Sequence, residues 1–197
     1  MANALDGKTI AILAADGVEQ VELEQPRKAV TDAGATTVLL SIHDGEIQAT
    51  RHDINPADRF AVDKLVGDAS PGDYDGLILP GGVANPDNLR LDADAIAFLQ
   101  AYFKTGKPVG VICHGPWSLV EADLVRGRTI TSYPSIRTDI VNAGGNWVDK
   151  EVVTDQGLVS SRSPDDLPAF CAKLIEEFAE GRHQIHDEGA TAKASLR

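Results

Sequence analysis

Cys113 is the residue of this sequence whose position most favours chemistry. Residues 109–112 (VGVI) are apolar or small and predict a buried strand, and Gly115-Pro116 open an apolar run with helical spacing. A side chain at such a strand-to-helix turn projects above the C-terminal edge of the sheet, towards the unpaired N–H groups of the helix. Those groups favour a negative charge, so a thiol there ionises more easily than one with the ordinary pKa of about 8.5. The position therefore predicts a reactive thiolate.

A second interpretation of Cys113 is structural, because most free cysteines are small buried hydrophobic residues. The other cysteine, Cys171, falls in an apolar stripe with helical spacing and is expected in the core. Two cysteines do not make a disulfide framework, and a reducing compartment suits a reactive thiol.

Polar and glycine-containing segments follow three of the predicted strands. These are residues 15–20 (ADGVEQ), 79–88 (LPGGVANPDN) and 113–116 (CHGP). In a parallel sheet the ligand crevice lies beyond the carboxyl ends of the strands. We therefore expect the three segments to meet at one edge of the sheet.

The first two segments contain candidate partners for the thiol. Glu19 could share a proton with the sulfur or act as acid and base, although a solvated glutamate at a helix N-terminus is common. Gly81 and Gly82 leave main-chain N–H groups uncovered, which could bind the oxyanion formed when Cys113 attacks a carbonyl. An ordinary turn explains a Gly-Gly pair equally well.

His114 follows the cysteine directly, and neighbouring side chains at a strained turn are not expected to face each other. We expect its imidazole to point towards a third group or a neighbouring subunit. Asp87 is a candidate to orient that imidazole. From the residues alone, a helix cap or turn is the better interpretation of Asp87.

The whole-chain numbers limit the class of protein. The 197 residues are 43% hydrophobic and 24% charged, which suits one domain with one substantial core. The net charge of -12 argues against a nucleic-acid partner, because such partners are held by clustered Lys and Arg. No apolar run approaches the ~20 residues that span a bilayer, and the start lacks the features of a signal peptide. We expect a cytoplasmic protein with no membrane partner.

The end of the sequence differs from the rest. Residues 181–197 lack apolar periodicity, so we expect a domain over 1–180 followed by a mobile segment. The pair His183 and His186 is a weak metal motif at best. We predict no metal site and no cofactor.

Strand-like and helix-like stretches alternate along the chain. Such alternation predicts an α/β fold, a flavodoxin-like three-layer sandwich with a mainly parallel sheet and helices on both faces. A hairpin-like excursion is expected within residues 43–66, and Pro26 is expected to kink or restart the first helix. The predicted strands are 8–14, 36–42, 77–79, 108–112, 127–133, 146–155 and 157–161, and the predicted helices are 18–34, 92–106, the run after Cys113, 134–145 and 163–181.

Five segments, in order, resemble the PfpI family within the class I glutamine amidotransferase-like superfamily, which also holds the parkinsonism-associated deglycase. The resemblance covers nearly everything from Lys8 to Phe178. The segments are DGVEQVELEQPRKAV, YDGLILPGG, GKPVGVICHGPWSLVEA, GRTITSYPSIRTDIVNAGGNWVDKEVV and SSRSPDDLPAFC.

The resemblance implies roles for individual residues. Cys113 would be the nucleophile, Glu19 the carboxyl group that contacts its sulfur, and His114 the neighbouring base. Gly82 and the His114 backbone amide would be the oxyanion donors. Related proteins carry a Glu at the position of Asp87, supplied by the adjacent subunit to hold the histidine, and here the side chain is shorter. A homodimer or larger homo-oligomer is also implied.

The resemblance narrows the reaction without fixing the substrate. The His-x-Glu pair of true amidotransferases is replaced by SSRSPDDLP, so glutamine hydrolysis is not expected. We expect a cofactor-free, stress-response cysteine hydrolase or lyase of the deglycase or glyoxalase type, acting on reactive carbonyls or early glycation adducts, with intracellular protease activity as a variant. The alternative is a non-catalytic oxidative-stress sensor or chaperone that uses oxidation of Cys113.

Overall fold

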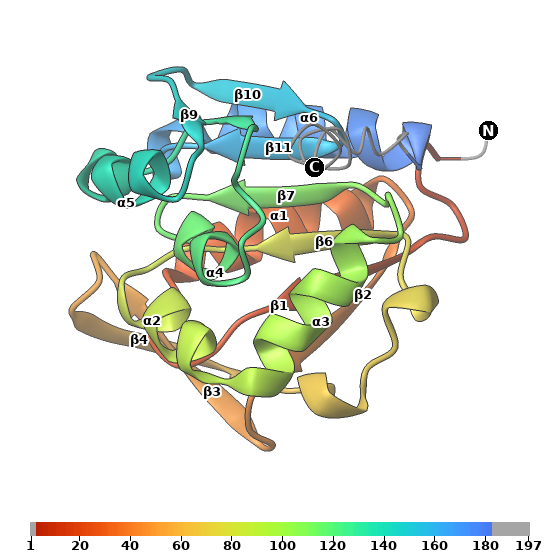
Figure 1. The fold of residues 1–197 in the computed structure, drawn as a ribbon. Coiled ribbons are helices and arrows are strands. Elements are labelled where there is room, and N and C mark those ends of the chain that lie inside the picture. The colour runs from red at the N-terminus through yellow and green to blue at the C-terminus, as the bar shows by residue number, and fades with distance from the viewer. Residues whose placement is uncertain (1–2, 183–197) are drawn as a thin grey trace, which may run out of the picture.

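A seven-stranded sheet covered by helices on both faces forms the centre of the computed structural model, which describes residues 3–182 (Figure 1). The strand order is β10-β11-β7-β6-β1-β2-β5, and every neighbouring pair is parallel except β10 with β11. The fold class expected from the sequence is confirmed. The sheet strands are β1 (Thr9–Leu13), β2 (Thr36–Ser41), β5 (Lys64–Leu65), β6 (Gly76–Leu79), β7 (Val109–Ile112), β10 (Val152–Asp155) and β11 (Leu158–Ser161).

Two layers of helices pack on the sheet and divide the core in two. Alternate residues of the central strands enter opposite halves: Leu77 and Leu79 of β6 join one cluster, and Ile78 joins the other. One face carries α1 (Gln20–Asp32) and α6 (Leu167–Glu180), and the other carries α2 (Ala84–Leu91), α3 (Ala93–Phe103), α4 (Pro116–Glu121) and α5 (Arg137–Asn142) (Figure 1).

Smaller elements complete the described part of the chain. Two 2-stranded sheets pair β3 (Glu46–Arg51) with β4 (Asn55–Ala61) and β8 (Thr129–Ile130) with β9 (Asn146–Trp147). Single 3-10 turns lie at Val66–Asp68, Pro71–Asp73, Pro134–Ile136 and Pro164–Asp166.

Parallel register brings three strand ends together. Ile12 of β1 pairs with Ile78 of β6, and Leu79 of β6 pairs with Val111 of β7. The loops that follow these strands therefore leave the sheet at the same edge, as the sequence predicts. β6 and β7 are buried throughout, which explains why both are short, uninterrupted apolar runs.

Two expectations for the helices need correction. α1 is continuous through Pro26, with no restart. Cys171 is only half-buried, because it lies beside the apolar stripe of α6 rather than on it; the buried residues of that helix are Leu167, Phe170, Leu174, Glu177 and Phe178.

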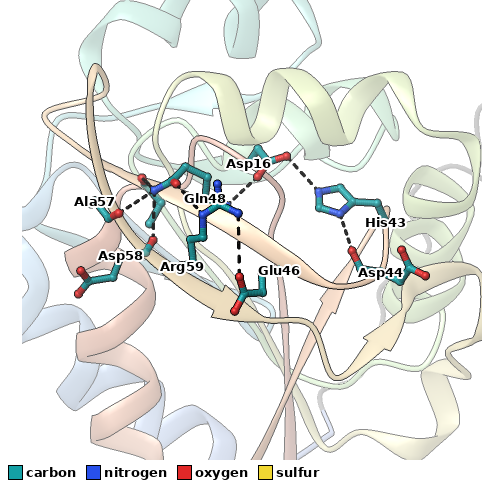
Figure 2. Close-up of polar contacts among 9 residues, drawn as sticks. Asp16, His43, Asp44, Glu46, Gln48, Ala57, Asp58 and Arg59 are labelled. Atoms are coloured by element: carbon teal, nitrogen blue, oxygen red, sulfur yellow. Dashed lines mark hydrogen bonds and ion pairs between the residues drawn. The ribbon is translucent and has the colours of Figure 1, made fainter.

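The expected excursion is the β3–β4 hairpin, and hydrogen bonds hold it to the loop after β1. The backbone N–H of Gln48 donates to Asp16 Oδ1 at 2.6 Å, and the Gly17 N–H donates to the Gln48 carbonyl at 2.8 Å. The other oxygen of Asp16 lies 3.0 Å from Nε2 of His43, and Arg59 on β4 donates to the Gln48 side chain (Figure 2). The hairpin is therefore fixed against a loop that leads to the site edge.

Within residues 3–182, no helix is long and apolar enough to cross a membrane, and no cluster of three or more His, Cys, Asp or Glu side chains could hold a metal ion. The His183 and His186 motif, and residues 183–197 of the 181–197 segment expected to be mobile, lie outside the described residues.

Candidate active site

Cys113 sits on a strained turn between β7 and α4. Its φ of 60° is in the left-handed region, where a non-glycine residue is disfavoured by roughly 1–2 kcal/mol. Backbone hydrogen bonds hold the turn, because the Cys113 N–H donates to the Ser161 carbonyl at 3.1 Å and its carbonyl accepts from Tyr133 N–H at 2.9 Å. Gly115 is also required, since a Cβ atom there would lie 2.7 Å from the Leu79 carbonyl oxygen. This is the strand-to-helix geometry predicted for the thiol.

Two backbone N–H groups, those of Gly82 and His114, donate to the Cys113 sulfur. Gly82 reaches this position with a φ of 82°, and a Cβ atom on it would collide with the Gly17 carbonyl oxygen. The two groups lie where the resemblance places the oxyanion donors. Gly81 differs from expectation, because its N–H donates to Oε2 of Glu22 at 2.9 Å.

The carboxyl group beside the sulfur belongs to Glu22, so the expectation for Glu19 needs correction. Glu22 lies in the first turn of α1, fully buried, and is a hydrogen-bond partner of the Cys113 thiol. Its Oε1 atom has no hydrogen-bond partner within the described residues. The helix register explains the difference, because Glu19 precedes the helix whereas Glu22 faces inward.

The sequence contains a signal for Glu22. Glu22, Pro26 and Val30 are spaced at i, i+4 and i+8, so they share one helix face, and all three are buried. A glutamate on the inward face of an amphipathic helix needs a polar partner inside the protein. Glu19 is four, seven and eleven residues from Leu23, Pro26 and Val30, which is also a helical spacing, so the pattern alone does not separate the two glutamates.

Glu19 has a different place at the same edge. Its carboxylate accepts the Asp53 N–H at 3.1 Å, and its own N–H donates to the Gly81 carbonyl at 3.3 Å. Glu19 therefore links the β3–β4 hairpin to the turn after β6.

The buried pair of Cys113 and Glu22 controls where the proton sits. Burial raises the pKa of Glu22 from 4.5 to about 8, partly offset by the hydrogen bonds from Gly81 N–H and the Cys113 thiol. Burial and the Glu22 charge raise the pKa of the Cys113 thiol, whereas the N–H groups of Gly82 and His114 lower it. Two charges this close are disfavoured, so the pair holds a proton near neutral pH. The two N–H groups do not offset the effects that raise the pKa of the Cys113 thiol, so the expectation of a thiol that ionises more easily than usual is wrong for this site.

His114 faces the sulfur, contrary to the expectation that neighbouring side chains would point apart. Its Nδ1 atom lies 3.2 Å from the Cys113 Sγ atom, and its Nε2 atom lies 3.0 Å from Ser135 Oγ. The ring stacks on Tyr133 with centroids 4.7 Å apart. Burial lowers the pKa of His114, which favours the neutral imidazole. Ser135 and Tyr133 carry no signal in the sequence that would assign them to this site.

Asp87 is exposed in the first turn of α2, and within residues 3–182 no hydrogen bond or ion pair joins it to His114. The helix-cap interpretation is also not met, because the cap of α3 is Asp92, which accepts the Ala95 N–H at 2.8 Å. A role for Asp87 across a subunit boundary stays a prediction.

Comparison with known proteins identifies the family. The sequence model of the DJ-1/PfpI family matches residues 8–177. The chain belongs to the DJ-1/PfpI family. Its match to the family spans the cysteine turn, the Gly81-Gly82 turn and Glu22, so the whole edge described above is part of the family region.

Two curated relatives and one solved structure illustrate the range of this family. A Bacillus subtilis protein named "Putative cysteine protease YraA" is 41% identical over 83% of this chain and 94% of its own length. A deglycase of Pyrococcus abyssi is 40% identical over 85% of this chain and 97% of its own length. The crystal structure of Drosophila melanogaster DJ-1beta superposes with a TM-score of 0.79, at 25% identity, over 87% of this chain and 90% of that one.

Proposed function

We propose that this DJ-1/PfpI-family protein is a cofactor-free cysteine hydrolase or lyase that acts on small reactive carbonyls or early glycation adducts. The proposal rests on the groups around the Cys113 sulfur. They are the Glu22 carboxyl group, whose pKa is raised, a ring nitrogen of His114, and two backbone N–H groups. This combination supplies a nucleophile, proton carriers and an oxyanion site in one place. The name of the Pyrococcus relative, a deglycase, supports the same class.

The first step follows from these groups. Nδ1 of neutral His114 takes the proton of the Cys113 thiol, the sulfur adds to the carbonyl carbon of an aldehyde to form a C–S bond, and the π electrons of the C=O bond move to the oxygen. The negative charge leaves the sulfur and appears on the oxygen, so the N–H groups of Gly82 and His114 are available to stabilise it. Glu22 then gives its proton to the alkoxide, and a hemithioacetal results. The proton held at Nδ1 of His114 is returned in later steps.

Methylglyoxal illustrates how the cycle closes. A proton moves from the carbon bonded to sulfur to the neighbouring carbonyl carbon, through an enediol, and converts the adduct to a lactoyl thioester of Cys113. Water then hydrolyses the thioester to lactate and the free thiol. The net reaction adds one water to methylglyoxal and needs no oxidant.

The burial of the sulfur supports small substrates over peptides. Cys113 is 5% exposed and Glu22 is fully buried, which suits a carbonyl at the end of a small molecule or side chain. Peptidase activity is a variant of the same chemistry, and the name of the Bacillus subtilis relative supports it. We expect slower turnover of peptides than of aldehydes.

The test is methylglyoxal loss with detection of lactate by the purified protein. Cys113→Ala should abolish turnover, and Cys171→Ala, the matched control at the half-buried second thiol, should retain it. Multiple turnovers that survive Cys113→Ala would overturn the proposal, as would the absence of turnover with methylglyoxal and glycated peptides alike.

Oxidation sensing is the second candidate, because a protonated Glu22 beside the sulfur could donate a hydrogen bond to an oxidised sulfur. Stoichiometric oxidation of Cys113 by dilute peroxide, without turnover of any carbonyl, would favour it.

We further propose a cytoplasmic homo-oligomer in which Asp87 of one subunit lies near His114 of another. Sedimentation would give the number of subunits. Asp87→Ala should change turnover only if the subunits associate, and a monomer with full turnover would overturn this part.

A further inference from the structure

The tip of the β3–β4 hairpin holds two consecutive residues in a conformation that costs energy. His52 has a φ of 54° and Asp53 a φ of 64°, although neither is glycine. Such residues persist where surrounding contacts hold them, and they cluster at functional sites. The contacts of the tip therefore indicate what it does.

Asp53 makes two hydrogen bonds to loops of the candidate active site. Its carboxylate oxygen Oδ1 accepts the Val83 N–H at 2.9 Å. Its own N–H donates to Oε2 of Glu19 at 3.1 Å. Both partners lie on segments that follow strands of the main sheet, whereas Asp53 belongs to the separate hairpin.

These bonds lead directly to the sulfur. Val83 follows Gly82, whose N–H donates to Cys113, so Asp53 fixes the peptide next to that donor. Glu19 donates its N–H to the Gly81 carbonyl, which fixes the other side of the same turn. Asn85 also binds this turn from within α2, through the Pro80 and Gly81 carbonyls at 2.9 and 3.0 Å. Asp53 is the residue of the β3–β4 hairpin that contacts this turn, through the Val83 N–H.

We propose that Asp53 is a positioning residue of the Cys113 site, which holds the Gly81–Val83 turn so that the Gly82 N–H points at the sulfur and at the oxyanion. The inference rests on the proposed role of Cys113 as the reactive thiol. The strain at His52 and Asp53 has a physical reason in this arrangement, because the left-handed turn directs both the carboxylate and the N–H of Asp53 towards the site.

The charge of Asp53 supports this placement. It raises the pKa of Glu22 and of His114, although burial is the largest influence on both groups. The charge of Asp53 therefore acts on both groups, although no hydrogen bond or ion pair joins it to either of them within residues 3–182.

Matched substitutions separate the hydrogen bond from other effects. Asp53→Gly keeps the left-handed backbone and removes the carboxylate, whereas Asp53→Asn keeps an oxygen that can accept the Val83 N–H and removes the charge. His52→Gly is the control, because His52 is the adjacent residue with a left-handed backbone. Within residues 3–182 it makes neither of the two hydrogen bonds that Asp53 makes. All are made with Cys171→Ala so that only Cys113 can be alkylated.

The measurement is the rate of Cys113 alkylation by iodoacetamide between pH 5 and 9, which needs no turnover. Asp53→Gly should raise the apparent pKa of the thiol by about one unit, which is a roughly tenfold loss of rate at a pH below that pKa. His52→Gly and Asp53→Asn should stay within about threefold of the parent rate, where threefold corresponds to half a pKa unit. Circular dichroism confirms that each variant is folded.

Two results would overturn the inference. Asp53→Gly could match His52→Gly, or Asp53→Asn could lose as much reactivity as Asp53→Gly, which would exclude the hydrogen bond as the cause. Failure of the proposed function gives a different result: the alkylation rates of the variants would follow the predicted order, but the protein would turn over no carbonyl. A parent protein whose Cys113 does not react at any pH would overturn both.

Discussion

Nδ1 of His114 lies 3.2 Å from Sγ of Cys113, the residue immediately before it in the chain. The left-handed backbone of Cys113 makes this contact available, because it turns the chain sharply between the two side chains. The other ring nitrogen, Nε2, lies 3.0 Å from the Ser135 hydroxyl. In a neutral imidazole one nitrogen donates and the other accepts. The tautomer in which Nε2–H donates to the Ser135 oxygen leaves Nδ1 free to take the thiol proton.

Replacing Ser135 should disturb the tautomer of His114. With Nε2–H bonded to the Ser135 oxygen, Nδ1 carries the lone pair that faces Cys113. Ser135→Ala should lower kcat by about tenfold, which is ~1.4 kcal/mol, and leave KM nearly unchanged. Ser135→Thr keeps a hydroxyl and should restore most of the rate.

Steady-state kinetics with methylglyoxal provide the measurement, and Ser118→Ala is the control. Ser118 is a buried hydroxyl on α4 whose oxygen has no hydrogen-bond partner within residues 3–182. Equal losses in Ser135→Ala and Ser118→Ala would argue against an orienting role for Ser135.

Tyr133 is expected to exclude part of the solvent from the His114 ring. Its ring stacks on the imidazole, and burial lowers the pKa of His114. Tyr133→Leu removes the stacked ring and should raise that pKa towards its ordinary value of about 6.5, because desolvation of the charged form is relieved. Tyr133→Phe keeps the ring and should leave the pKa unchanged. NMR titration of the His114 ring protons measures both, and a pKa that falls in Tyr133→Leu would contradict this account.

Gly82 and Gly45 offer a matched pair of glycines, because both have a φ of 82°. A Cβ atom on Gly45 meets nothing within 4 Å, whereas one on Gly82 collides with the Gly17 carbonyl oxygen and lies 2.7 Å from the Glu19 nitrogen. Gly45→Ala should cost only the backbone strain of roughly 1–2 kcal/mol in the free energy of unfolding. Gly82→Ala should cost more than that and slow alkylation of Cys113, since the donor N–H must move.

Urea unfolding measures the difference between these two variants. Equal losses of stability in the two variants would show that the turn after β6 can shift to accommodate a Cβ atom on Gly82 at no extra cost in the free energy of unfolding. An unchanged alkylation rate in Gly82→Ala would mean that this N–H is not needed at the sulfur.

The sequence predicts most strands of the main sheet, the longer helices and the Cys113 turn, because each depends on local pattern. The expected strand 146–155 is wrong, because it is β9 and β10 in two different sheets, and α2 and β5 are not among the expected elements. Apolar runs give β6 and β7, and alternation with helices gives the parallel sheet. The partners of the thiol depend on which way side chains point, and local spacing alone does not distinguish Glu19 from Glu22. Both have helical spacing to Pro26 and Val30, and the start of the helix at Gln20 is what places Glu22 inside it and Glu19 before it.

Other parts of the site could not be derived from sequence. Asp53 and Ser135 reach the site from a hairpin and from the turn before α5, at a distance along the chain from both Cys113 and Glu22. Their contacts depend on where those segments pack. Nothing in their residue types separates them from ordinary turn residues.

Glu22 should make the free energy of unfolding fall as the pH rises, whereas a carboxyl group with a lowered pKa has the opposite effect. Its pKa is about 8 in the folded protein because of burial, against 4.5 in the unfolded chain. The folded state therefore keeps a proton that the unfolded state releases. The contribution of protonated Glu22 to the free energy of unfolding is fully present below about pH 4.5 and is lost as the pH rises through 8.

Glu22→Gln removes this titration, so the two proteins should diverge as the pH rises. The free energy of unfolding of the parent should fall relative to Glu22→Gln between pH 5 and 8, by an amount on the order of 3–5 kcal/mol. Urea unfolding at several pH values gives the two profiles, and titrations common to both proteins cancel in their difference. Parallel profiles for the parent and Glu22→Gln would mean that Glu22 ionises in the folded protein at its ordinary pKa, and that it has no proton to give at Cys113 near neutral pH.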